Sequence, residues 1–432
     1  MKKYLALLIA AAMSTSILAG CGSAATSQRD SSAQVSSADS TTDVTSNSKN
    51  VKSSETIDIK IWHDGDEAIM QTIADQVNSQ LSGDNITVTF EKKTDMPNQL
   101  KLYGNDPVNA PDMYFYAHDV LGSFCAMDIL ASLSDVTDTS ALLADILPMP
   151  VEAGQYQGTQ YLLPVYFESL VFIYNKDLWE GDIPSTTEEL YEYMVDHTDT
   201  AAGTYALVNQ HTNAYNVSPF IYGFGGYVID KNGTPGFDDP NTIEAAEYNK
   251  KFGALEADGD YNTVTTLFNE GKAAAIIGGP WLASGIEEAG IEYGIVSLSD
   301  ITLPNGNGMA PFSGVQGAGV LKTALAEKKD AIAKVLQAMA SPEVGIDLAN
   351  KSGCAPANNK AYEDESVSSD EMISAIQRTA STAVPMPNIP EMNAMWSPAE
   401  AMFVAINVNG VDAVQAAADA QTAALQAIAD MQ

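Results

Sequence analysis

From residue 57 onward, short apolar segments alternate with amphipathic ones, and this alternation limits what the chain can fold into. Ile57, Ile59 and Ile61 alternate with polar residues, which is the pattern of a half-buried strand. The next segment, 66–81, places its apolar residues on one helical face. Strand-like segments follow at 86–90 and 113–116. Strands that alternate with helices predict an α/β fold built of βαβ units with a largely parallel sheet.

The same rhythm continues to the C-terminus, and 432 residues are enough for two domains with full cores. Further strands are expected at 171–174, 205–208 and 273–277. Ser185 and Glu188 have the spacing of a capping box for the helix between the first two of these strands. Other helices are expected at 241–255, 327–340, 342–351, 368–381, 394–407 and 411–431.

A targeting segment precedes the folded part. Lys2 and Lys3 form a charged start, an apolar run follows, and small residues lead to Cys21. This order predicts a signal peptide over residues 1–20. The run Leu18-Ala19-Gly20-Cys21 resembles a bacterial lipobox, which implies that Cys21 becomes a lipidated N-terminus. Several acyl chains would anchor the protein to the extracellular face of the cell membrane.

Residues 21–55 are expected to be the lipidated cysteine followed by a disordered tether. Residues 22–55 include 15 Ser or Thr among 34 and no aromatic residue. Such a segment cannot bury enough apolar surface to offset the entropy lost on ordering. A flexible coil of this length spans roughly 30 Å.

Charge and cysteine content exclude several classes of partner. The formal net charge of −35 repels nucleic acid, so no nucleic-acid partner is expected. Cys125 and Cys354 could form one disulfide or remain buried free thiols. No CxxC pair occurs and the four histidines lack metal-ligand spacing, so we expect no metal and no cofactor.

The sequence contains none of the common catalytic motifs. The chain has no nucleophile elbow, no HExxH helix, no P-loop and no GxGxxG after a strand. Paired carboxylates could serve a glycosidase, with Asp66, Asp119 and Glu168 as candidates. In a chain with 56 acidic residues, however, such a set arises easily by chance.

Aromatic residues at the ends of predicted strands and in turns favour a sugar site instead. Tyr116 lies near the end of a strand, Tyr215 in a polar loop, Trp281 after a Gly-Gly-Pro turn, and Trp396 after Pro390. Flat rings can cover the apolar faces of hexoses, and fixed carboxylates can bind the hydroxyl rim. In open parallel sheets, ligands bind outside the carboxyl ends of strands, where these residues are expected.

Several stretches resemble the maltose- and maltodextrin-binding members of the extracellular solute-binding proteins. They are Ile61-Trp62-His63-Asp64-Gly65-Asp66, Ala110-Pro111-Asp112, Ala117-His118-Asp119, Ile173-Tyr174-Asn175-Lys176-Asp177-Leu178, Phe268-Asn269-Glu270-Gly271-Lys272, Gly279-Pro280-Trp281 and Met386-Pro387-Asn388-Ile389-Pro390. The resemblance extends from about Ile57 to the C-terminus. It implies a monomeric sugar receptor of an ABC importer, with the permease transmembrane subunits as partners and no enzymatic activity.

The resemblance also assigns roles to individual residues. Asp66, Asp119 and Glu168 match carboxylates that accept hydrogen bonds from glucose hydroxyls. The residues that match stacking aromatics are Tyr215, Tyr261, Trp281 and Trp396, with Tyr116 standing where the family has a tryptophan. The chain departs from the family at Glu67 and Val120, which replace a lysine and an arginine, and at Asn213, which replaces a glutamate.

The fold implied by the resemblance is a two-lobed, periplasmic-binding-protein-like fold with a hinge and a central ligand cleft. The first lobe would comprise 56–166 plus 316–364, and the second 168–314 plus 366–432. Residues 166–168 and 313–315 would be hinge strands. Contacts from both lobes would favour a closed, sugar-bound form.

Three alternatives remain open from the sequence. The ligand could be another oligosaccharide, such as a β-linked or galactose-containing one. The protein could be a glycoside hydrolase that uses Glu168 with an aspartate. It could also be a surface adhesin that holds starch without transport. Among sugars, we expect maltotriose and longer maltodextrins to bind more tightly than maltose, and cellobiose not to bind measurably.

Overall fold

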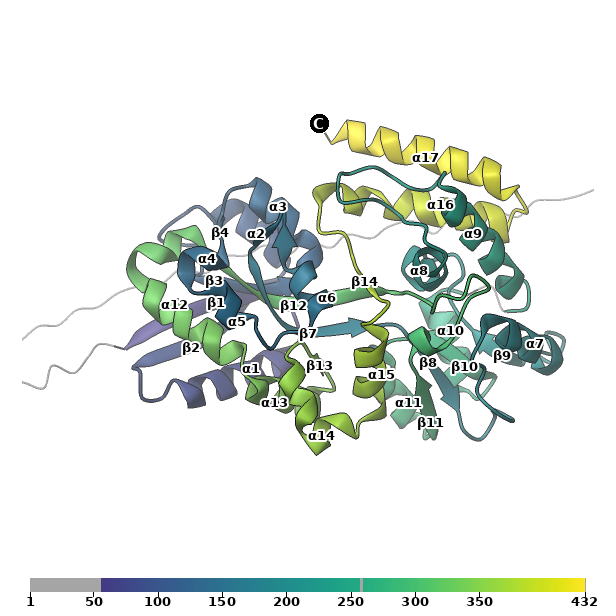
Figure 1. The fold of residues 1–432 in the computed structure, drawn as a ribbon, viewed down its shortest axis with the longest axis horizontal. Helices are drawn as coiled ribbons and strands as arrows, with labels where there is room; N and C mark the ends of the chain where they lie inside the picture. The colour runs from purple at the N-terminus through teal and green to yellow at the C-terminus, as the bar shows by residue number, and fades with distance from the viewer. Residues whose placement is uncertain (1–55, 257–258, 432) are drawn as a thin grey trace, which may run out of the picture. The chain divides into compact units, whose positions relative to one another are not determined.

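The computed structural model describes residues 56–256 and 259–431 (Figure 1). The predicted signal peptide, the lipidated Cys21 and the tether lie outside the described residues. Within the described ranges, no helix combines the length and the apolar character needed to cross a bilayer.

The first sheet contains the N-terminal strands. Its order is β13 (Ala355–Pro356), β7 (Leu162–Ser169), β12 (Phe312–Leu321), β3 (Met113–Ala117), β1 (Ile57–His63) and β2 (Ile86–Lys92). The short strands β4 (Leu130–Ala131) and β14 (Val384–Pro385) also pair with β12. Strand β1 alternates exposed and buried residues at its start, as expected, and is parallel to β2 and β3.

The second sheet has the order β11 (Tyr293–Val296), β8 (Val171–Asn175), β10 (Ala273–Gly278) and β9 (Tyr205–Val208). A separate pair is formed by β5 (Gln155–Tyr156) and β6 (Thr159–Gln160). The prediction of a largely parallel sheet is wrong, because both sheets are mixed. Strand β12 is antiparallel to both β3 and β7, and β8 is antiparallel to β10 and β11. These pairings depend on where distant strands insert, which local periodicity does not encode.

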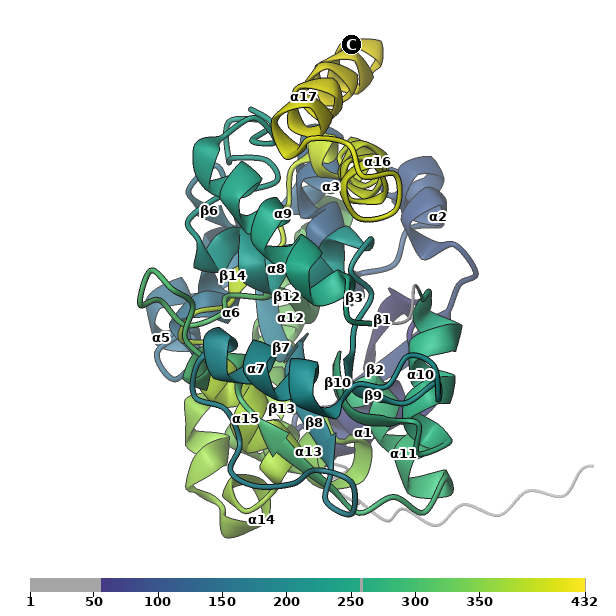
Figure 2. The ribbon, with the colours of Figure 1, turned by 90° about the vertical axis from the view of Figure 1, so that its right-hand side faces the viewer.

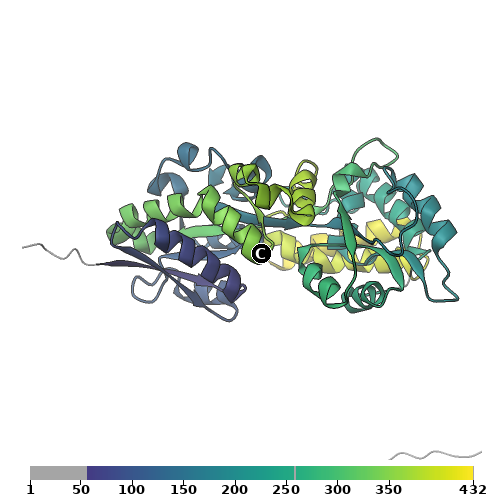
Figure 3. The same ribbon diagram turned by 90° about the horizontal axis from the view of Figure 1, so that it is seen from below.

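Helices cover both sheets. Beside the first sheet lie α1 (Glu67–Gln80), α2 (Met96–Tyr103), α3 (Leu121–Ala126), α4 (Leu133–Val136), α5 (Thr139–Leu142), α6 (Pro148–Ala153), α12 (Leu325–Met339) and α13 (Pro342–Ser352). Helices α1 and α13 pack along each other (Figure 3). The buried face of α1, which includes Met70, Ile73 and Val77, joins the core under β1 and β2.

The remaining helices are α7 (Thr187–His197), α8 (Ala214–Gly223), α9 (Pro240–Gly253), α10 (Tyr261–Asn269), α11 (Ala283–Glu288), α14 (Glu365–Ser368), α15 (Glu371–Thr379), α16 (Trp396–Asn407) and α17 (Ala413–Asp430). Helices α8, α9 and α16 pack together (Figure 2). The capping box of α7 is one residue later than expected. Thr186 accepts from the backbone of Glu189, whose side chain accepts from Thr186.

The two predicted hinge stretches are neighbours in the first sheet. Ser313, Gly314 and Val315 of β12 pair with Ser169, Glu168 and Phe167 of β7. Only Leu170 separates β7 from β8, so the chain passes from the first sheet to the second almost without a loop.

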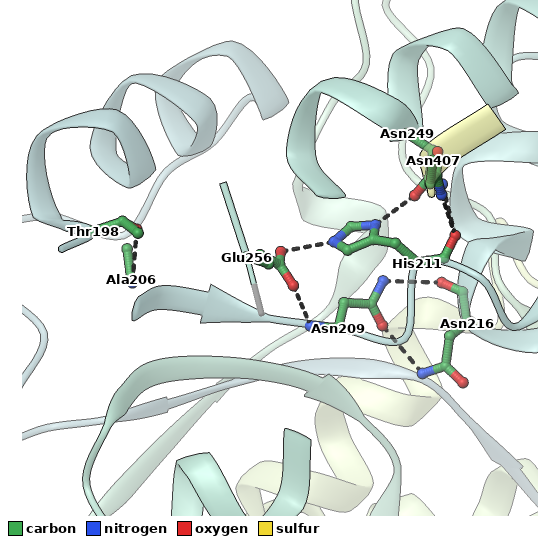
Figure 4. A network of polar contacts seen from close by, with 8 residues as sticks. All are labelled: Thr198, Ala206, Asn209, His211, Asn216, Asn249, Glu256 and Asn407. Carbon is green, nitrogen blue, oxygen red and sulfur yellow. Dashed lines mark hydrogen bonds and ion pairs between the residues drawn. The ribbon is translucent and has the colours of Figure 1, made fainter. Parts of the chain in front are cut away.

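A buried polar network joins the end of β9 to α9 (Figure 4). The imidazole of His211 lies 2.7 Å from Glu256 Oε1 and 2.5 Å from Asn249 Oδ1. Glu256 Oε2 accepts from the Asn209 backbone at 2.6 Å. The carbonyl of His211 accepts from the amides of Asn249 and Asn407. The network therefore fixes the loop that leads to α8.

Candidate functional site

Glu168 lies on the hinge strand β7, directly opposite Gly314 of β12. A Cβ atom at position 314 would lie 3.3 Å from Glu168 Oε1, so glycine leaves room for the carboxylate. Burial raises the pKa of the Glu168 carboxyl. One carboxylate that can accept hydrogen bonds from a ligand therefore lies where β7 and β12 pair.

A row of aromatic rings lies beside this carboxylate. The Tyr215 ring is 6.3 Å from the Trp281 ring and 6.2 Å from Phe312, and Phe312 is 6.1 Å from Trp396. Burial raises the pKa of the Tyr215 hydroxyl, and the charge of Glu168 adds to this effect, so the two groups lie close together. Three of the predicted stacking residues are thus brought together around Phe312.

The backbone before Trp281 explains its exposure. A Cβ atom on Gly279 would lie 2.2 Å from the Trp281 ring, so only glycine lets the indole fold back over this turn. The turn follows β10, and Trp281 keeps 41% of its surface exposed. An exposed indole next to a tyrosine offers an apolar face to a ligand.

Tyr116 and Asp119 form a second group at the end of β3. Asp119 Oδ1 is buried and has no hydrogen-bond partner among the described residues. Burial raises the pKa of the Asp119 carboxyl. Burial also raises the pKa of Tyr116 to about 12, helped by the charges of Asp64, Asp119 and Asp95. A buried oxygen without a donor is costly, and a ligand hydroxyl could supply the missing hydrogen bond.

Asp66 and Glu67 lie at the start of α1. Asp66 caps this helix, with Oδ1 accepting from the backbone of Ala68 at 2.7 Å and of Ile69 at 3.3 Å. The charges of Asp66 and Glu168 both help to raise the pKa of the buried Cys354 thiol, after the larger effect of burial. Glu67 is exposed, and its Oε2 lies 3.9 Å from Nε2 of His63.

Asn213 and Tyr261 have fewer contacts with the other candidate residues. Asn213 caps α8, accepting from the backbone of Tyr215 at 3.0 Å, and donates to Glu400 Oε1 at 3.4 Å. Tyr215 therefore lies in the first turn of α8, and the prediction that it lies in a loop is wrong. Tyr261 begins α10 and is 45% exposed, and none of the other candidate rings packs against it among the described residues.

Two supporting residues were not predicted. Phe312 joins the Tyr215 and Trp396 rings, and its backbone N–H donates to Ser218 Oγ at 2.9 Å. Ser218 Oγ donates in turn to the Tyr215 carbonyl at 2.6 Å. The position of Phe312 directly before the hinge stretch was the only sequence signal that could have indicated its role.

A pocket of about 1050 Å³ lies away from these residues. It is lined by parts of three segments, 152–158, 222–233 and 383–391, and by none of the ten candidate residues. The candidate site is therefore defined by the rings and carboxylates above and not by this pocket.

The described residues contain no group of three His, Cys, Asp or Glu arranged to hold a metal ion. Cys125 and Cys354 are both free, so the disulfide alternative is wrong. Burial raises the pKa of each thiol to about 12.

Comparisons with known proteins all give proteins that bind solutes outside the cell or bind sugars. A family model described as bacterial extracellular solute-binding protein matches residues 72–375. The maltotriose-binding protein of Pyrococcus abyssi is 30% identical over 347 residues, which cover 78% of this chain and 75% of that protein. A maltooligosaccharide ABC transporter solute-binding lipoprotein of Streptococcus pneumoniae is 32% identical over 340 residues, covering 75% and 76%.

The fold is also shared with solved structures. A crystal structure of a cyclo/maltodextrin-binding protein complexed with maltotetraose superposes with a TM-score of 0.80 and 22% sequence identity. The match covers 87% of this chain and 98% of that one. The two-lobed α/β fold expected from the sequence is thereby confirmed.

Proposed function

This chain belongs to the bacterial extracellular solute-binding proteins, and we propose that it captures maltodextrins for an ABC importer. The observation that carries the proposal is the row of Tyr215, Trp281 and Trp396 beside the half-buried carboxylate of Glu168. Successive glucose rings of a curved α-1,4 glucan can follow such a row of aromatic faces. Relatives that carry maltotriose and maltooligosaccharides in their names support this ligand class.

The carboxylates supply selectivity. Among the described residues, one buried oxygen of Asp119 has no partner, and Glu168 is half-buried beside the rings. A sugar hydroxyl at the right position would donate to these oxygens, whereas a misplaced hydroxyl would leave them unpaired, which is strongly unfavourable. The Asp66 carboxylate already caps α1, so only its remaining acceptor positions are free to bind a sugar hydroxyl.

Capture would proceed by closure of two lobes about the paired strands β7 and β12. The proposed lobes are 56–166 plus 316–364 and 168–314 plus 366–432, with Glu168 and Gly314 at their junction. A sugar that contacts both lobes binds the closed form more tightly and shifts the population toward it. The permease would then recognise the closed form.

We place the protein outside the cell, as its family is extracellular, and propose an anchor through lipidated Cys21. A relative described as a lipoprotein supports this anchor. We propose that the protein is a monomer that binds its permease at the membrane and has no catalytic activity. Glu168 and Asp119 thus act as hydrogen-bond acceptors.

Calorimetry with maltose, maltotriose, longer maltodextrins, cellobiose and raffinose tests the proposal. We expect maltotriose and longer maltodextrins to bind more tightly than maltose, and cellobiose to give no measurable heat. Preferential binding of cellobiose or raffinose would overturn the ligand assignment. Release of reducing sugar during incubation would indicate a glycoside hydrolase, and an unchanged radius of gyration at saturating sugar would indicate a rigid adhesin.

A further inference from the structure

His118 lies between two candidate sugar residues and yet cannot touch solvent. It follows β3 as the first residue of a short 3₁₀ helix, His118–Val120, with Tyr116 before it and Asp119 after it. Its exposure is 0%. The ring therefore works through its protein partners.

Both ring nitrogens are hydrogen-bonded to backbone groups of distant segments. The backbone N–H of Val315 donates to Nδ1 at 3.1 Å. Because Nδ1 accepts, the ring proton lies on Nε2, which donates to the carbonyl of Met386 at 2.8 Å. A single neutral tautomer thus satisfies both bonds.

Both partners lie at the hinge strand β12. Val315 is on β12, opposite Phe167 of β7. Met386 follows β14, and its N–H donates to the Ser313 carbonyl at 3.2 Å. The single side chain of His118 therefore holds β12 and the segment around Met386 at the same time.

The segment 386–388 is also fastened to the elements near β3. The Asn388 carbonyl accepts from Gly122 N–H at 2.8 Å, and its side-chain amide donates to the carbonyls of Ala153 and Gln155 at 3.0 and 2.6 Å. Eight residues beyond Asn388, the chain reaches Trp396 at the start of α16. A displacement of segment 386–388 would thus be passed on to an aromatic residue of the candidate site.

We propose that His118 is a positioning residue for sugar capture, which fixes Asp119 relative to β12 and to segment 386–388. This inference rests on the proposed function. If β12 or segment 386–388 moved alone, a buried carbonyl or N–H would lose its partner, which is costly. The three segments therefore stay together beside the hinge while the lobes close, and the carboxylate of Asp119 keeps its place relative to β12 and segment 386–388.

Two substitutions remove one bond each. In His118→Asn, the amide oxygen can replace Nδ1 as acceptor for Val315, but the donor to Met386 is lost. In His118→Gln, the amide nitrogen can replace Nε2, but the acceptor for Val315 is lost. Asn358→Ala is the matched control, because Asn358 is 5% exposed, donates to the Ala340 carbonyl and accepts from Lys360 N–H, away from the candidate residues.

We expect each His118 variant to bind maltotriose at least about tenfold more weakly than wild type, and Asn358→Ala to bind within twofold. The effect of His118→Asn should shrink in a Trp396→Ala background, because segment 386–388 is expected to act on the sugar through Trp396. Loss of stability in all three variants with unchanged affinity would overturn the proposal and leave His118 a structural residue only.

Hydrogen exchange separates this inference from the proposed function. If the wild-type protein binds none of the maltodextrins, the proposed function fails, but the coupling can still be measured. The amides of Gly122 and Met386 should then exchange faster in His118→Asn than in wild type and Asn358→Ala. Unchanged exchange of both amides would overturn the coupling itself.

Discussion

His118 and His211 are both buried, and each has both ring nitrogens hydrogen-bonded, yet they are held in opposite protonation states. Nδ1 of His118 accepts from a backbone N–H, which requires a neutral ring. Both nitrogens of His211 face acceptors, Asn249 Oδ1 and Glu256 Oε1. The Asn249 amide nitrogen donates to the His211 carbonyl, so its oxygen must face the ring. Both nitrogens of His211 therefore carry protons when Glu256 is ionised, a state that burial of the Glu256 carboxyl opposes by raising its pKa.

The pKa values follow from these partners. Burial lowers the pKa of His118 to about 4. Burial also lowers the pKa of His211, but Glu256 and Asn249 outweigh it, so the net shift is upward. Burial alone therefore does not decide the charge of a histidine, because the hydrogen-bond partners can reverse its effect.

The two histidine rings also differ in which parts of the molecule they connect. The ring of His118 bonds backbone groups of β12 and of the segment around Met386, whereas the ring of His211 bonds the side chains of Asn249 and Glu256. We infer that the first region bears mainly on sugar capture and the second mainly on stability. The following predictions test this difference.

Glu256→Leu should have the largest effect on stability. It leaves the His211 imidazolium buried without a counter-charge, so the free energy of unfolding should fall by about 3–5 kcal/mol. Chemical denaturation near pH 6 measures the loss. The double variant His211→Leu with Glu256→Leu should recover part of it, and maltotriose affinity should fall less in both than in the His118 variants. A fall in affinity as large as theirs would break the proposed separation of the two regions.

Acid should weaken the His118 region. A histidine with a folded pKa of about 4 stabilises the fold fully above its unfolded pKa and loses this contribution as the pH falls toward 4. The loss amounts to roughly 3 kcal/mol. The unfolding free energy of wild type should therefore fall more between pH 7 and pH 4 than that of His118→Gln. Parallel pH profiles would contradict a neutral, buried ring.

His211 should show the opposite sign. Its pKa is raised in the fold, so its contribution is present below its unfolded pKa and is lost as the pH rises through the folded value. The difference in unfolding free energy between wild type and the double variant His211→Leu with Glu256→Leu, which leaves no buried titrating partner behind, should shrink as the pH rises. If it grows instead, the pair with Glu256 is not ionic.

Trp281→Ala should change binding and spare stability. Its ring is 41% exposed, so little burial is lost, but an aromatic face for the sugar disappears. We expect maltotriose affinity to fall about tenfold, close to 1.4 kcal/mol. Calorimetry and denaturation on the same sample measure both quantities. Wild-type affinity would show that the sugar lies elsewhere.

Tyr261→Ala should have the smallest effect. The family resemblance includes Tyr261 among the stacking residues, but none of the other candidate rings packs against it. We expect a loss of affinity below about threefold, less than for Trp281→Ala. A larger loss would mean that closure brings Tyr261 onto the sugar.

Local patterns of the sequence predicted most elements but not their assembly. The alternation of Ile57, Ile59 and Ile61 predicted β1, and the helical face of 66–81 predicted α1, because these signals lie within one element. The antiparallel insertion of β12 between β3 and β7 depends on residues more than 140 positions apart, and no local pattern records it.

The candidate site shows the same limit. Glu168, Trp281 and Trp396 could be selected from their residue types and family resemblance, but Phe312 became visible only as the ring that joins two others. The tautomer of His118 likewise depends on Val315 and Met386, which are 197 and 268 residues away. Sequence could indicate that His118 belongs to a motif but not which atom carries its proton.

The two free thiols have a practical consequence for building an optical sugar sensor. With pKa values of about 12, Cys125 and Cys354 present roughly one thiolate in ten thousand molecules at pH 8. Maleimide dyes react with the thiolate, so Cys125 and Cys354 should remain unlabelled. In a sensor made without Cys21, a single cysteine introduced at an exposed position, such as Val408, would then carry the dye without removal of Cys125 or Cys354.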